Sequence, residues 1–158
     1  MILSFDPGET TGYAFVDYDS NYGTDGFQKP STGLRLVTCD QIPWNLRLFR
    51  CEALIAFASQ APIEAVVIES FHLYAHKAKA QIGNTFPSVQ VIGIIEAFCY
   101  THGIREKIVF QSASEIARTL IRPEHEHLLT SEHMRDAYKH ARLWLIKQGL
   151  EGVTRVDI

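Results

Sequence analysis

The sequence predicts an α/β fold in which a mixed five-stranded sheet is flanked by helices. The chain opens with three strand-like segments in succession, and their direct connections indicate antiparallel pairing. Two later apolar runs are separated from them and from each other by helix-like segments, which is typical of parallel strands. Three antiparallel strands followed by two parallel ones, with helices between, therefore favour a mixed sheet with helices on its faces.

The first strand leads directly into a carboxylate. The apolar run from Ile2 to Phe5 has the character of a strand, and Pro7 and Gly8 turn the backbone immediately after Asp6. The end of a strand holds a carboxylate more precisely than a loop does, which is what a metal site requires. The alternative is that Asp6 only accepts hydrogen bonds from the turn, an ordinary role for Asp before Pro-Gly.

The other elements follow from apolar periodicity and from residues that start or stop helices. Residues 18–32 are a polar insert, read as a long hairpin loop, and residues 121–129 are read as a loop. Ser112 and Glu115 have the spacing of a capping box, and Thr130-Ser131 cap the last helix. Strands are predicted at 12–17, 33–38, 65–68 and 107–110, and helices from 44 to a stop before Pro62, at 88–102, at 112–120 and from 130 to about 149.

Length and composition indicate one globular domain over residues 1–158. The chain is 46% hydrophobic and 21% charged, which is ordinary for a globular protein. Its apolar stretches are far shorter than the roughly 18 residues of a membrane span, and its N-terminus lacks a secretion signal. Cys39, Cys51 and Cys99 form no C-x-x-C pair and are read as small buried hydrophobes in a reducing compartment. A cytoplasmic location is predicted.

The formal net charge of −3 restricts how the chain can contact nucleic acid. Proteins that bind phosphates are usually basic, so a nucleic-acid surface here must be a local patch on an acidic remainder. Carboxylates gathered around metal ions would account for part of the negative charge.

Further candidate ligands lie at a second strand end and on the last helix. Glu69 directly follows the apolar run 65–68, as Asp6 follows the first strand. His133 and Asp136 are three residues apart and share one helix face, beside the predicted buried stripe. The alternative interpretations are that Glu69 faces solvent and that His133 and Asp136 form an ordinary surface pair. His140, one turn further on, is read as a solvated neighbour or, at most, a residue that supports a ligand.

In combination these residues resemble the RuvC-type Holliday junction resolvases of the RNase H-like nuclease superfamily. The matching segments are Ile2 to Gly12 with its D-P-G-x-x-T-G core, Val66 to Glu69, and His133 to Ala137. The order of strands and helices is similar over nearly the whole chain. The compact size and the polar insert are more similar to phage-encoded members than to bacterial ones.

The resemblance implies a metal-dependent endonuclease that resolves four-way DNA junctions. Asp6 would bridge two cations, Glu69 and Asp136 would each be ligands, and His133 would take a fourth ligand position where many relatives have Asp. Oxygen ligands suit Mg²⁺, and an imidazole also accommodates Mn²⁺. Two such ions activate a water and stabilise the leaving oxygen in phosphodiester hydrolysis.

The stretch after Glu69 is the candidate DNA contact. Phe71, Tyr74, Lys77 and Lys79 mix rings that stack on unpaired bases with cations that bind phosphates. In the resolvases the equivalent loop reaches the opened centre of the junction, so Phe71 or Tyr74 is a candidate wedge. The alternative places these rings in the core.

The helix at 88–102 has apolar residues on more than one face, and the resemblance implies a homodimer through it.

Glu124 to His127 alternate acid and histidine, but their spacing fits no zinc pattern and predicts a solvated loop. A nucleotide-binding ATPase domain is disfavoured because the further glycine-rich phosphate loops are missing, so no nucleotide cofactor is expected. A broader structure-specific nuclease, an RNase H and a non-catalytic nucleic-acid-binding module remain alternatives.

Overall fold

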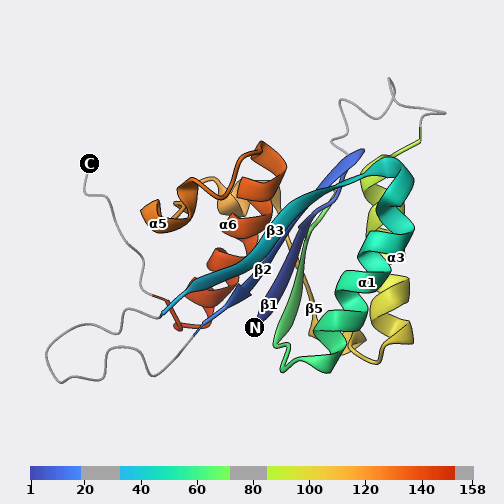
Figure 1. Ribbon diagram of the computed structural model, residues 1–158, viewed down its shortest axis with the longest axis horizontal. Coiled ribbons are helices and arrows are strands. Elements are labelled where there is room, and N and C mark those ends of the chain that lie inside the picture. The colour runs from blue at the N-terminus through green and yellow to red at the C-terminus, as the bar shows by residue number, and fades with distance from the viewer. Residues whose placement is uncertain (19–32, 72–84, 152–158) are drawn as a thin grey trace, which may run out of the picture.

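The computed structural model describes residues 1–18, 33–71 and 85–151. Its main strands and helices follow one another in the predicted order, with the last strand ending at Gln111 and a long helix after it (Figure 1). The elements are β1 (Ile2–Asp6), β2 (Thr10–Asp17), β3 (Arg35–Pro43), η1 (Trp44–Leu46), α1 (Arg47–Gln60), β4 (Ala65–Glu69), α3 (Pro87–Thr101), η3 (Arg105–Lys107), β5 (Ile108–Gln111), α4 (Ala113–Ile116), α5 (Pro123–Glu126) and α6 (Glu132–Lys147).

The five strands form one mixed sheet in the order β3-β2-β1-β4-β5. β1 pairs antiparallel with β2, and β2 pairs antiparallel with β3, with a register shift between Phe15 and Val16. β4 lies parallel to β1, and β5 lies parallel to β4. The predicted fold class, three antiparallel strands and two parallel ones, is confirmed.

Helices cover both faces of this sheet. α1 and α3 lie side by side on one face, and α6 lies on the other with α5 beside it (Figure 1). Because side chains alternate along a strand, the central strands need apolar residues at successive positions to bury both faces. In β1, Leu3 and Phe5 join the core under α1 and α3, while Ile2 joins the core under α6. The continuous apolar run of β4 divides in the same way.

Several element boundaries differ from the predicted ones. β3 runs five residues past the predicted end at residue 38, because Cys39 to Pro43 continue the ladder with β2. α4 has only one turn, although its capping box is present as predicted. The predicted continuation to residue 120 is wrong: after Ile116 the chain forms a turn in which the Thr119 N–H donates to the Ile116 carbonyl, and the Leu120 carbonyl accepts a hydrogen bond from the Arg142 guanidinium on α6.

The predicted loop at residues 121–129 is also incorrect, since it contains the short helix α5. Pro123 occupies the first helical turn, where its missing N–H has no cost. Cys51 and Cys99 are buried in the core under α1 and α3, as predicted, whereas Cys39 on the edge strand is half-buried. Within the described ranges, no helix has the length and apolar character needed to cross a membrane.

Candidate active site at the carboxyl edge of the sheet

The two strand-end carboxylates emerge at the same edge of the sheet and on the same face. β1 and β4 are parallel neighbours with Phe5 opposite Ile68, so Asp6 and Glu69 are the next residues along each strand. Two-residue alternation puts Asp6 on the face of Ile2, under α6, and puts Glu69 on that face as well. The sheet therefore directs both acids toward α6, as the candidate site requires.

Helix α6 brings the other two candidates to this edge. Its first turn is capped by Ser131, whose hydroxyl accepts a hydrogen bond from the Met134 N–H at 3.2 Å. One turn later, the buried hydroxyl of Ser4 on β1 lies 2.6 Å from the Ala137 carbonyl oxygen and donates to it. The cap fixes the start of the helix, and the Ser4 contact holds it against β1 beside the turns that carry His133 and Asp136.

Gly12 is what allows α6 to lie this close to the sheet. A Cβ atom at this position would lie 2.1 Å from the His133 carbonyl oxygen and 2.8 Å from the His133 Cβ. The carbonyl oxygen belongs to the backbone and cannot move without shifting the start of α6 or strand β2. The last glycine of the D-P-G-x-x-T-G segment is therefore required for packing next to the candidate site.

Asp6 is the most buried of the candidate ligands. Its side chain is 14% exposed, and its Oδ2 lies 2.7 Å from Nδ1 of His133. Burial raises the pKa of Asp6 to about 6; the hydrogen bond from His133 opposes this rise, and the carboxylates of Glu69 and Asp136 add to it. Glu69 and Asp136 thus both lie near enough to Asp6 for their negative charges to disfavour its ionised form.

Each of the three acids is paired with a basic side chain from α6. His133 contacts Asp6 at 2.7 Å, the Lys139 ammonium donates to Asp136 at 2.8 Å, and His140 contacts Glu69 at 3.1 Å. One helix thus supplies all three counter-groups.

The site has ligand types that fit a divalent cation. Three carboxylates and one imidazole are the donor set that Mg²⁺ or Mn²⁺ accepts, and repulsion between the acids favours a cation among them. The described part of the chain, however, contains no group of three or more His, Cys, Asp or Glu side chains that is already arranged to hold an ion. A cation bound at Asp6 and Asp136 would take the place of their present partners, His133 and Lys139.

His140 corrects one prediction. It is not a solvated neighbour: its ring is fully buried, with Nε2 at 3.1 Å from Glu69 and Nδ1 at 2.9 Å from Gln111. Sequence reasoning also missed Gln111 and Lys139. Their positions carried a signal, because Gln111 ends β5 as Glu69 ends β4, and Lys139 is three residues from Asp136.

The candidate DNA-contacting residues are only partly described. Phe71 is 37% exposed and its ring packs on Phe86, with 5.2 Å between the ring centroids. Phe71 is therefore outside both core clusters. Tyr74, Lys77 and Lys79 lie outside the described residues, and their predicted contacts with DNA stay predictions.

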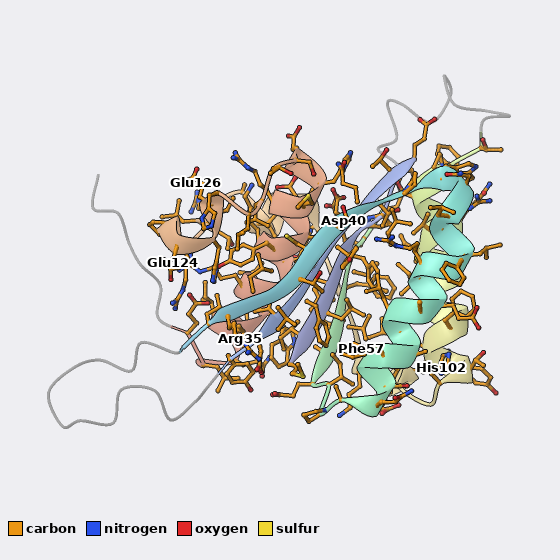
Figure 2. The ribbon with its side chains drawn as sticks, viewed as in Figure 1. Arg35, Asp40, Phe57, His102, Glu124 and Glu126 are labelled. Carbon is orange, nitrogen blue, oxygen red and sulfur yellow. The ribbon has the colours of Figure 1, made fainter. Side chains whose placement is uncertain are left out.

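The acid and histidine tract on α5 has a structural role that the sequence did not predict. Glu124 and Glu126 are exposed on the outer side of the molecule (Figure 2), in keeping with a solvated segment. His125 is not solvated, since it is buried and its Nδ1 lies 2.8 Å from the Tyr138 hydroxyl on α6. Helical periodicity turns this one residue inward, toward α6.

Comparison with known proteins supports the fold. The sequence matches no protein-family model and no curated protein sequence. The structure is similar to that of Thermus thermophilus RuvC, with a TM-score of 0.61 and 16% identity over 94% of this chain and 96% of that chain.

Two further matches are protein–DNA complexes. T. thermophilus RuvC with a Holliday junction substrate gives a TM-score of 0.61 at 15% identity, over 94% of this chain and 96% of that one. A Fowlpox virus resolvase in complex with substrate Holliday junction DNA gives a TM-score of 0.55 at 12% identity, over 93% of this chain and 99% of that chain. At these identities the likeness establishes the RNase H-like fold of RuvC.

Proposed function

We propose that this protein is a metal-dependent endonuclease that resolves four-way DNA junctions by phosphodiester hydrolysis. The observation that carries the proposal is the convergence of Asp6, Glu69 and Asp136 from three elements at one edge of the sheet. The similarity of the fold to two resolvases bound to Holliday junctions supports the choice of substrate. The phage origin and the cytoplasmic location stay predictions.

Asp6, Glu69, Asp136 and His133 would hold two divalent cations, Mg²⁺ or Mn²⁺. When bound, such ions supply an activated water and stabilise the leaving oxygen of the phosphodiester. The protein's own contribution is to hold its acids at rigid strand ends and on a capped helix. His133 and Lys139 lie at the open side of the site, 45% and 27% exposed, so they can leave Asp6 and Asp136 without unpacking the core.

The experiment that tests this function uses purified protein and three substrates of matched sequence. A mobile four-way junction, a linear duplex and an RNA–DNA hybrid are incubated in EDTA, Mg²⁺ or Mn²⁺, and the products are resolved on denaturing gels. We expect cleavage of the junction only with metal. Preferential cleavage of the hybrid would indicate an RNase H instead. Binding of the junction without cleavage under any metal condition would indicate a non-catalytic module.

The proposal includes a homodimer through α3, the helix predicted at residues 88–102. An exposed stripe at helical spacing supports it: Val89 is 47% exposed and Tyr100 is 70% exposed, with Gly93 and Ala97 between them on the same face. A two-fold dimer gives two active sites, which suits paired cuts in a symmetric junction. Light scattering of free and junction-bound protein tests this, and Tyr100→Glu should dissociate the dimer. A constant monomer mass in both states would contradict it.

A further inference from the structure

Glu69 is held differently from the other two acids. Its partner His140 is fully buried, whereas the side chains of Lys139 and His133 are 27% and 45% exposed. The His140 ring is also fixed from its far side, where Nδ1 lies 2.9 Å from the Gln111 amide oxygen. The buried imidazole therefore has a hydrogen-bond partner at each nitrogen.

This arrangement follows from the topology of the sheet. Glu69 and Gln111 are register partners at the carboxyl ends of β4 and β5, and both face α6. His140 enters between them from the second turn after His133. The three side chains form a line of buried polar contacts that ends at the one carboxylate oxygen nearest the ring, Oε2 of Glu69.

The ring can donate to Glu69 in either protonation state. An imidazolium donates from both nitrogens, to Gln111 and to Glu69. A neutral ring donates from Nε2 when Gln111 turns its NH₂ group toward Nδ1, and this NH₂ group is buried without a hydrogen-bond partner among the described residues. The contact with Glu69 thus does not depend on the charge of His140.

We propose that His140, anchored by Gln111, is a positioning residue that orients the Glu69 carboxylate for a divalent cation. The inference deepens the proposed function and depends on it. Residues that fix a metal ligand from behind typically change metal affinity by about 10- to 100-fold when they are replaced. The competing view is that His140 is only a basic group near acids, in which case its removal would favour cation binding.

Two substitutions separate the two hydrogen bonds of the ring. In His140→Gln the terminal amide nitrogen reaches about as far as Nε2, so the contact with Glu69 is kept and the contact with Gln111 is lost. In His140→Asn the shorter amide keeps the contact with Gln111 and loses the one with Glu69. Each variant loses one buried hydrogen bond, and thermal unfolding of both variants compares their stabilities.

The measurement is calorimetric titration of Mn²⁺ into DNA-free protein, so that it does not depend on cleavage. We expect His140→Gln to bind within about threefold of the parent and His140→Asn to bind about 10- to 100-fold more weakly. Lys139→Gln is the control for electrostatics: loss of a competing ammonium should tighten binding several-fold. If His140→Asn does not fold, Gln111→Met replaces it, and the unanchored ring should weaken binding several-fold.

The outcomes distinguish the inference from the function on which it depends. Mn²⁺ binding to His140→Asn at parental affinity, equal losses in the Gln and Asn variants, or tighter binding in either of them would overturn the positioning role alone. A parent that binds no Mn²⁺ in the calorimeter would overturn both the metal site and the role of His140.

Discussion

The two faces of the sheet are built from the same strands but carry different chemistry. On the face covered by α1 and α3, β1 and β4 present Leu3, Phe5 and Ile68, which are fully buried in an apolar core. On the face covered by α6, the same strands end in Asp6 and Glu69. Near the carboxyl edge of the sheet, apolar side chains cover the face under α1 and α3, whereas the face under α6 carries acids paired with basic side chains.

The difference shows how one chain separates stability from function. Alternation along a strand lets adjacent residues serve the two purposes, because each points to the opposite layer. Burying Asp6 costs free energy, as its raised pKa shows, and the apolar core on the other side of the same strands offsets that cost. We expect changes on the α6 face to alter chemistry and changes on the other face to alter stability.

The largest expected effect is that of Asp6→Asn. The amide keeps the shape of the side chain and an acceptor for His133, but it removes the charge that a cation requires. Junction cleavage should fall by about 10³-fold or more, or ~4 kcal/mol of transition-state stabilisation. Gel-based cleavage assays measure the rate and native gels measure junction binding, which should stay near the parental level. An Asn variant that cuts like the parent would remove Asp6 from the site.

Gly12→Ala and Gly93→Ala compare the two faces directly. The methyl group at position 12 would meet the His133 backbone at 2.1 Å, so α6 must shift. We expect a loss of about 3 kcal/mol in unfolding free energy, as in other overpacked sites. Metal affinity should fall with it, because His133 and Asp136 move away from Asp6.

The matched change on α3 should have the opposite sign. Within one subunit a Cβ at Gly93 would meet no atom within 4 Å, and alanine favours a helix over glycine by roughly 1 kcal/mol, so Gly93→Ala should stabilise the monomer. Urea unfolding of both variants measures the difference. Similar destabilisation by the two alanines would show that the close approach of α6 does not constrain Gly12.

The third prediction concerns pH in the absence of metal. A carboxyl group whose pKa rises from 3.8 to about 6 on folding stabilises the protein fully below its unfolded pKa, and this contribution is lost as pH rises through about 6. In EDTA, the parent should lose on the order of 2 kcal/mol relative to Asp6→Asn between pH 4 and pH 7. Parallel stability curves for the two proteins would mean that Asp6 is not held in a desolvated position.

The smallest expected effect is that of Tyr138→Phe. This change removes the hydroxyl that contacts His125 but keeps the ring in the core under α6. We expect a loss of about 1 kcal/mol in unfolding free energy and no change in cleavage rate or metal affinity. A loss of activity at unchanged stability would show that the contact between His125 and Tyr138 influences the candidate site.

Local patterns were sufficient to predict most of the fold. The order and type of the main elements depend on apolar period and on start and stop residues, and both are properties of short segments. The capping box at Ser112 and Glu115 formed as predicted, but the length of its helix did not follow from the segment. A turn closes directly after Ile116, and the residues that follow it are held by a distant contact, in which Arg142 on α6 donates to the Leu120 carbonyl.

The sequence by itself determined where the acids are: Asp6 and Glu69 at strand ends, and Asp136 beside His133 on one helix face. Only the tertiary structure decided which basic groups meet them. Spacing on α6 does not say which side of the helix packs inward beyond its apolar stripe. Only the packing against the sheet therefore decided that His140 is buried beside Glu69 and that Lys139 pairs with Asp136. Because β5 pairs with β4, Gln111 lies beside Glu69, and the polar ends of these two strands give a buried imidazole the partners it needs.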